Sequence, residues 1–248
     1  MAPMAGVTDA AYRIMCRRRG AELAYTEMVS VAGLAHKSAK TWVLVEPEPE
    51  EPQICVQLFG TKPEQFAFAV NAVQERVGDK LTLIDINMAC PARKVITKGE
   101  GSALMKEPEL AASLVEACVR EARVPVTVKI RRGFAAGENT AAEFAARMEQ
   151  AGAAAVAVHG RTANQLYTGQ ADWSMRAANS AAVFSPAAKP RRILTVTGTR
   201  ASRTHASTSE AASSGSFMSA EPSPLVMTLR AGHAMLMSMS VSLSPTRS

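Results

Sequence analysis

The sequence predicts an α/β fold of the (β/α)8 barrel type. Short apolar runs typical of buried strands recur through the first 173 residues, with helix patterns between most of them. Apolar strands that alternate with capped helices at roughly 30-residue spacing are typical of parallel βαβ units. Polar residues stand at or near several strand ends, and this favours a barrel over an open sheet. The expected strands span residues 24–27, 53–58, 81–86, 126–130 and 154–159.

Helices between these strands carry start and stop signals. Thr61 and Glu64 form a capping box with Pro in the first turn, and Gly78 stands where the helix should end. Two further helices are expected over residues 8–19, with Thr8 as its cap, and over residues 140–152, with Thr140 and Glu143 as a capping box and Gly152 as its end.

The expected barrel is incomplete at both ends. Residues 2–6 read as the exit from a strand one whose body is missing, and strands seven and eight are not recognisable after Trp173. Residues 174–248 contain 16 Ser and no Asp, and they read as low-complexity chain that is disordered or poorly packed. We therefore expect a barrel portion over residues 1–173 and a basic tail over residues 174–248.

The net charge of +6 lies in that tail. Residues 1–173 carry 20 Lys+Arg and 20 Asp+Glu, whereas residues 174–248 carry 8 and 2. A basic tail of this kind indicates solvation or weak attraction to phosphate, not a shaped nucleic-acid surface. The chain has no apolar run of about 18 residues, no signal peptide and no zinc-type cysteine spacing. These features predict a reduced cytoplasmic protein with no membrane segment and no metal.

Four polar side chains recur in one local setting, at or near the end of a strand-like run: Gln57, Cys90, Lys129 and His159. Carboxyl ends of parallel strands meet at one rim, so these positions suggest one shared site. Each also has a structural alternative. Cys90 could be a small buried apolar residue, Lys129 half of a core salt bridge, His159 a hydrogen-bonded rim histidine and Gln57 an ordinary strand residue.

Six stretches, in order along residues 2–173, resemble the tRNA-dihydrouridine synthases, nearest to the bacterial B-type subfamily. They are residues 2–9, 57–60, 85–91, 101–104, 126–131 and 158–162. The resemblance implies a flavin-binding (β/α)8 barrel followed by a small helical domain. It also implies reduction of the 5,6 double bond of particular uridines in tRNA, with FMN as cofactor and NADPH as the reductant.

The resemblance also implies residue roles. Cys90 would be the general acid that protonates C5 of the uracil, which suits a thiol because a thiol is mostly protonated at neutral pH. The flavin would meet the backbone of Pro3, Met4 and Ala5, the side chains of Gln57 and Lys129, and, near the ring or on its phosphate side, His159. The substrate would lie near Asn87 and Arg161. Apart from the resemblance, Arg93, Lys94 and Lys98 follow Cys90 in the same loop and are the candidates for contact with tRNA phosphates. We expect a monomer.

The chain departs from the family pattern after Trp173. The Gly-Asn-Gly-Asp and Gly-Arg segments expected at strands seven and eight, which hold the flavin phosphate, are not found there. We therefore expect a shift of reading frame near residues 173–180 and weak FMN binding by the chain as it stands. Two other hypotheses stay open: another FMN-dependent barrel oxidoreductase, and a non-catalytic remnant or basic-tailed RNA-associating protein. A yellow protein that absorbs near 450 nm would exclude the latter.

Overall fold

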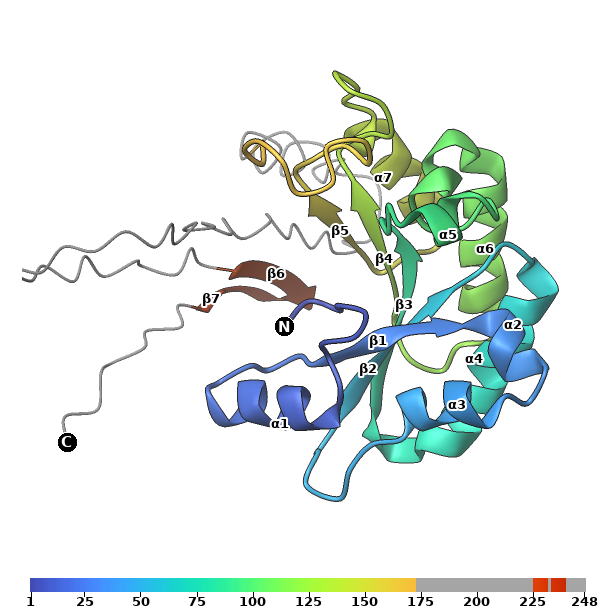
Figure 1. Cartoon of the computed structure of the whole chain (residues 1–248). Helices are drawn as coiled ribbons and strands as arrows, with labels where there is room; N and C mark the ends of the chain where they lie inside the picture. The colour runs from blue at the N-terminus through green and yellow to red at the C-terminus, as the bar shows by residue number, and fades with distance from the viewer. Residues whose placement is uncertain (173–224, 232, 240–248) are drawn as a thin grey trace, which may run out of the picture.

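The computed structural model describes residues 1–172, 225–231 and 233–239. Its main feature is a sheet of five parallel strands whose spatial order follows the chain (Figure 1). The strands are β1 (Tyr25–Ser30), β2 (Ile54–Phe59), β3 (Leu81–Met88), β4 (Val126–Arg131) and β5 (Ala155–His159). Each lies within a few residues of a strand that the sequence predicts.

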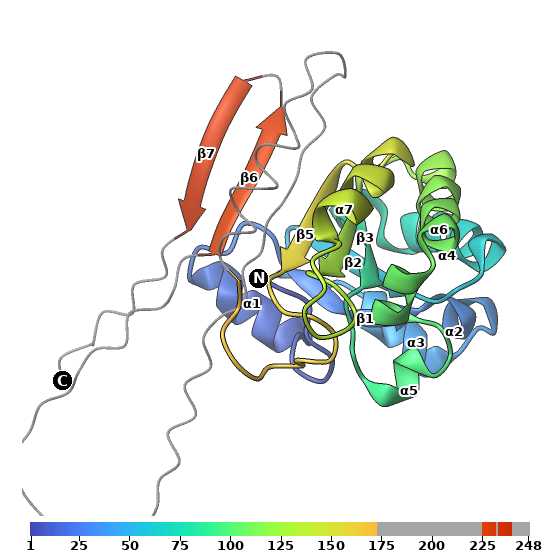
Figure 2. The same cartoon turned by 90° about the horizontal axis from the view of Figure 1, so that it is seen from above.

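The longer helices cover one face of this sheet. Figures 1 and 2 show α4, α6 and α7 together on the outer side of the curved sheet, while α1 lies beside the β1 edge. An open doubly wound sheet would carry helices on both faces, so strands in sequential order with helices outside indicate part of a (β/α)8 barrel. The helices are α1 (Ala10–Arg18), α2 (Val31–Ala35), α3 (Ala39–Trp42), η1 (Val43–Val45), α4 (Pro63–Val77), η2 (Gly78–Lys80), α5 (Arg93–Ile96), η3 (Gly101–Lys106), α6 (Pro108–Glu121) and α7 (Ala141–Gln150).

The register of the strands divides the sheet into two chemically different faces. Because side chains alternate along a strand, residues paired across parallel strands share a face. One row on the outer face is apolar throughout and runs Leu58, Ile86, Val128, Val156. The neighbouring row on the inner face runs Gln57, Asp85, Thr127, Ala155.

The main core lies between the outer face and the helices. Ile84, Ile86 and Val128 pack there against Phe66 of α4 and Leu114 of α6, and all five are fully buried. Full burial of a large apolar side chain contributes about 1.5–3 kcal/mol, so this layer is the principal source of stability. A smaller apolar cluster lies on the inner face toward the amino ends of the strands and contains Leu23, Tyr25, Cys55, Leu83, Ala155 and Ala157.

The predicted helix ends are confirmed better than the predicted caps. Gly78 and Gly152 follow α4 and α7 with φ of +59° and +104°. The cap of α1 is Asp9 and not Thr8, as its carboxylate accepts from Tyr12 N at 2.8 Å. Thr8 is unavailable because its hydroxyl bonds back to Met4. Neither Thr61 nor Thr140 makes a capping hydrogen bond, and α4 begins at Pro63 after Lys62.

The region after the barrel portion is described only in part. The expectation of disordered or poorly packed chain over residues 174–248 falls outside the described residues at 174–224, 232 and 240–248. Residues 225–231 and 233–239 form an antiparallel pair, β6 (Leu225–Ala231) and β7 (His233–Met239), in a sheet of their own (Figure 2). In the described segments, no helix has the length and apolar character needed to cross a membrane.

Candidate active site

A row of polar side chains lines the inner face at the carboxyl half of the sheet. Gln57 on β2 stands beside Asp85 on β3, and Asn87 stands beside Lys129 on β4. The alternation that points apolar residues outward at positions 56, 84, 86 and 128 points these residues inward. Three strands therefore bring to one place residues that are up to about 70 positions apart in sequence.

Hydrogen bonds join this row to the loop that carries Cys90. Gln57 Nε2 donates to Asp85 Oδ2 at 2.7 Å, and Asn87 Nδ2 donates to Gln57 Oε1 at 2.9 Å. Asn87 Oδ1 accepts from the backbone amides of Ala89 and Cys90, at 3.1 and 2.9 Å. The side chain of Asn87 thus fixes the turn at which β3 ends.

The Cys90 turn is also held from the other side, by residues 101–102. Ser102 N donates to the carbonyl of Cys90 at 3.0 Å. Gly101 has φ of +61°, and a Cβ on it would lie 2.6 Å from that same carbonyl oxygen. Only glycine fits this approach without a shift. Cys90 itself is partly exposed, so its backbone is held in place while the residue stays accessible.

Lys129 is the charged residue of the row, and its side chain is half-buried. Burial lowers the pKa of Lys129 to about 8, although the nearby Asp85 acts in the opposite direction. Within the described residues its ammonium group makes no hydrogen bond or ion pair. The core salt bridge considered for this residue is therefore not observed, and the ammonium group remains available to a ligand.

His159 and Arg161 lie together at the end of β5. Arg161 Nη1 is 3.3 Å from His159 Nε2, and the guanidinium also donates to the carbonyls of Thr168 and Gly169. Burial lowers the pKa of His159 to about 3, and Lys129 and the nearby arginines add to the effect. The imidazole is therefore neutral at physiological pH, where it can bind a ligand but carries no positive charge.

The remaining predicted site residues lie outside this row. Met4 is exposed, and the segment around it runs past the β1 edge, where Gly6 N donates to Glu27. Pro3 and Ala5 flank it in the same segment. Arg93 and Lys94 are exposed at the start of α5, three and four residues after Cys90.

Comparison with known proteins identifies the family. The profile described as "Dihydrouridine synthase (Dus)" matches residues 1–178. This chain belongs to the dihydrouridine synthase family. The prediction from the six sequence stretches is confirmed, and with it the (β/α)8 barrel class of the fold.

Bacterial relatives share about two fifths of the matched residues. A tRNA-dihydrouridine synthase B of Pseudomonas aeruginosa is 42% identical over 186 residues, which are 75% of this chain and 55% of that protein. The same enzyme of Xanthomonas axonopodis pv. citri is 41% identical over 186 residues, with the same coverage. A probable tRNA-dihydrouridine synthase 1 of Synechocystis is 41% identical over 172 residues, or 69% of this chain and 47% of that protein. The chain spans about half the length of the curated relatives it matches.

Two further residues bond to this site and were not among the predicted site residues. Asp85 accepts from Gln57, and it also accepts from Thr127 Oγ1 at 2.5 Å. Arg131 is only 2% exposed, and its guanidinium donates to the carbonyls of Ala89, Thr162 and Leu166. Asp85 and Arg131 could have been found from the alternation of side chains along a strand. Each lies two residues from a predicted site residue on the same strand and so shares its face of the sheet.

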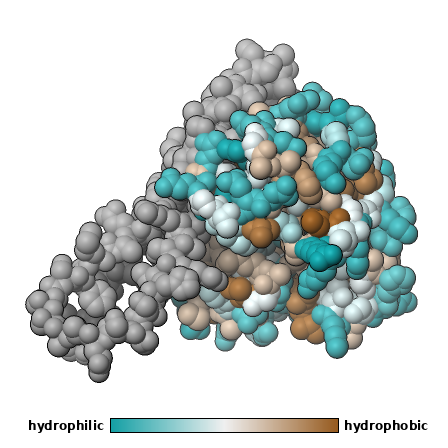
Figure 3. All heavy atoms as spheres, turned by 45° about the horizontal axis from the view of Figure 1, so that its top comes forward, coloured by the Kyte–Doolittle hydropathy of each residue, from teal (hydrophilic) through white to brown (hydrophobic). Residues whose placement is uncertain are grey.

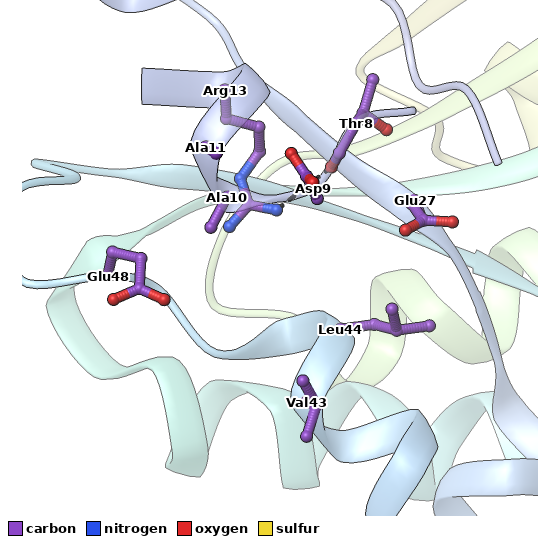
Figure 4. A pocket seen from close by; sticks show the side chains of 9 residues that line it. All are labelled: Thr8, Asp9, Ala10, Ala11, Arg13, Glu27, Val43, Leu44 and Glu48. Carbon is purple, nitrogen blue, oxygen red and sulfur yellow. Dashed lines mark hydrogen bonds between the residues drawn. The ribbon is translucent and has the colours of Figure 1, made fainter. Parts of the chain in front are cut away.

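A separate pocket of about 250 Å³ lies beside α1. Figure 4 shows its lining, which includes Asp9, Arg13, Glu27 and Glu48 but none of the predicted site residues. Arg13 is not free for a ligand, because its Nε and Nη2 donate to the buried carboxylate of Glu51, each at 2.7 Å. This pocket is therefore no rival to the Cys90 site.

The face drawn in Figure 3 adds no second candidate site. In Figure 3 the apolar side chains are scattered between hydrophilic ones and form no broad patch on the face shown. Among the residues that the structure describes, no group of three or more His, Cys, Asp or Glu side chains could hold a metal ion.

Proposed function

We propose that this chain carries the flavin-facing part of a tRNA-dihydrouridine synthase, which reduces particular uridines in tRNA to 5,6-dihydrouridine. The observation that carries the proposal is the partly exposed Cys90 thiol. Its backbone is fixed by Asn87 and Ser102, beside a half-buried Lys129 that makes no hydrogen bond or ion pair with the described residues. The names of the relatives support the substrate, which for this chain remains part of the proposal.

The residues of the row fit a flavin. The unpaired ammonium group of Lys129 suits a ring that carries carbonyl groups and becomes anionic on reduction, because a buried charge without a partner is very costly. Gln57 offers an amide on the same face, and neutral His159 offers a ring nitrogen. The exposed segment around Met4, with Pro3 and Ala5, supplies backbone groups. FMN, recharged by NADPH, supplies the hydride when it is bound.

Cys90 supplies the proton. Reduction of the uracil adds a hydride at C6 and a proton at C5, so one general acid is required on the protein side. The Cys90 S–H bond breaks as the new C–H bond forms, and solvent then restores the thiol. Asn87, which holds the Cys90 turn, and Arg161, at the end of β5, would contact the uridine. Arg93 and Lys94 on α5, with Lys98, would meet tRNA phosphates, and their contribution should weaken as salt is raised.

The proposal extends to the rest of the chain. The family profile ends at residue 178, close to where acidic residues become rare, and this supports a change of reading frame near residues 173–180. The chain as it stands would then bind FMN weakly, because the segments that anchor the phosphate are replaced. We place the protein in the cytoplasm as a monomer.

The test uses the 248-residue chain and a version with the frame restored. The restored frame should encode a Gly-Asn-Gly-Asp segment, and its product should be yellow and form dihydrouridine in tRNA. In that protein Cys90→Ala should keep the flavin and its reduction by NADPH but lower product formation by about 10²–10⁴-fold. Cys16→Ala, which alters another partly exposed cysteine on α1, is the matched control. Unchanged single-turnover product formation in Cys90→Ala would refute the role of Cys90. A flavin-bound protein that acts only on free pyrimidines would favour the other oxidoreductase hypothesis.

A further inference from the structure

The polar row contains a chain of hydrogen bonds that starts at Asp85 and ends at the backbone of Cys90. Its links are Asp85 to Gln57, Gln57 to Asn87, and Asn87 to the amides of Ala89 and Cys90. All of its side chains are buried. Two of the links are carboxamides, whose oxygen and nitrogen ends are alike in shape but opposite in hydrogen bonding.

The direction of this chain follows from the carboxylate. An ionised carboxylate only accepts hydrogen bonds, so Gln57 must turn its NH2 group toward Asp85 and its carbonyl toward Asn87. Asn87 must then turn its own NH2 group toward Gln57, which leaves its carbonyl for the two backbone amides. Reversal of either carboxamide would bring two acceptors or two donors together in a buried place, at the cost of an unmade hydrogen bond.

Burial raises the pKa of Asp85, and three neighbouring groups act against that rise. Gln57 donates to one carboxylate oxygen, and the hydroxyl of Thr127 donates to the other at 2.5 Å. The charge of Lys129, like these two hydrogen bonds, lowers the pKa of Asp85. Because both carboxylate oxygens accept a hydrogen bond and a cation lies nearby, the geometry corresponds to the ionised carboxylate.

We propose that Asp85 is a positioning residue that sets the orientation of the Gln57 and Asn87 carboxamides and so holds the Cys90 backbone for reaction. The catalytic part of this proposal rests on the proposed function, whereas the hydrogen-bond geometry does not depend on it. One consequence concerns ligands. Each carboxamide keeps one spare N–H, so together with Lys129 the row presents donors, which suit the carbonyl groups of a flavin or a uracil.

The Cys90 turn has two further anchors that do not depend on Asp85. Arg131 Nε donates to the carbonyl of Ala89 at 2.8 Å, and Ser102 N donates to the carbonyl of Cys90 at 3.0 Å. Loss of the orientation imposed by Asp85 should therefore release the amide side of the turn and leave its carbonyl side bonded. A general loss of packing would loosen both sides, so the two cases can be told apart.

The test is hydrogen exchange, resolved to single amides by NMR, on the full 248-residue chain with Asp85→Asn. This substitution keeps the size of the side chain but lets it offer either a donor or an acceptor to Gln57. We expect the Ala89 and Cys90 amides to exchange at least about 5-fold faster, with the Ser102 amide unchanged. The control is Glu121→Gln, which removes the same charge from a carboxylate that accepts from the Asn71 carboxamide at 2.8 Å on the outer helices. It should leave all three amides unaltered.

Two results would overturn the proposal: unchanged exchange at both amides in Asp85→Asn, or a uniform rise along all of β3. Gln57→Met removes the middle link of this series of hydrogen bonds. It tests the proposal if Asp85→Asn fails to fold. It should produce the same two-amide effect, and the double variant should add nothing to either single change. None of these measurements needs flavin or tRNA. A failure of the proposed function would appear as absent dihydrouridine while the exchange pattern still holds.

Discussion

The two faces of the five-stranded sheet are built from the same strands and have opposite chemistry. On the outer face, the row from Leu58 to Val156 is apolar from end to end and packs beneath the helices. On the inner face, the side chains change from apolar to polar along each strand toward its carboxyl end. On β3 the change lies between Leu83 and Asp85. Stability is thus concentrated on one face, and reactive groups on one half of the other.

The inner face is costly to the fold, and that cost indicates its function. Arg13 shows how the protein satisfies a buried cation when the role is structural, since two hydrogen bonds join it to Glu51. Lys129 has no such partner among the described residues, and its lowered pKa records the penalty. A destabilising charge with no hydrogen-bond or ion-pair partner in the described part of the chain is consistent with the ligand proposed for Lys129.

The cysteines provide the largest contrast within this comparison. Burial raises the pKa of Cys55, on the apolar half of the inner face, to about 12, and burial also raises the pKa of Cys118 in α6. At pH 8 only about one Cys55 thiol in ten thousand is ionised, and the thiolate is the reactive form. We expect iodoacetamide to label Cys90 at least about 10³-fold faster than Cys55. Peptide mass spectrometry measures both rates, and comparable labelling in the folded protein would show that the inner face is open throughout.

Truncation of the outer face should cause the largest change in stability. Ile84 is fully buried in the main core, so Ile84→Ala should lower the free energy of unfolding by about 2–5 kcal/mol. Its neighbour Leu83 points into the smaller inner cluster, and Leu83→Ala should cost less because fewer apolar groups surround it. Urea unfolding followed by circular dichroism compares the two. An equal loss for both variants would mean that the faces share the stabilising role.

Replacement of Lys129 should have the opposite sign. Its folded pKa of about 8 lies below its unfolded value, so the folded state pays to keep it charged at neutral pH. Lys129→Met should therefore raise the free energy of unfolding at pH 7 by about 1–3 kcal/mol. Between pH 8 and about 10.5 the unfolded chain binds the extra proton, so wild-type stability rises relative to the variant and the difference disappears. A destabilised variant at pH 7 would show that Lys129 has a structural partner.

The sequence predicted the strands and most of the inner row because both rest on alternation. Gln57 and Lys129 interrupt apolar runs, and such an interruption can be recognised in the sequence alone. Asp85 and Arg131 interrupt runs in the same way, but their roles depend on partners from other strands that sequence separation hides. Helix caps were predicted less well, because a hydroxyl near a helix start has several possible partners. The Thr8 hydroxyl, for example, donates to the carbonyl of Met4.

The smallest expected effect concerns the start of α4, the helix that covers the outer face. Thr61 has the sequence of a capping box, yet the N-cap position belongs to Lys62 and no side chain bonds to the first turn. The helix is held by Pro63 at its start and by the packing of Phe66 beneath it. Thr61→Ala should therefore change the free energy of unfolding by less than about 0.5 kcal/mol. Asp9→Ala is the matched comparison, because Asp9 does cap α1 and its loss should cost about 0.5–2 kcal/mol. If Thr61→Ala lowers the free energy of unfolding as much as Asp9→Ala does, then α4 depends on a capping interaction. Packing on the outer face would then contribute less to holding α4 than the contrast between the two faces implies.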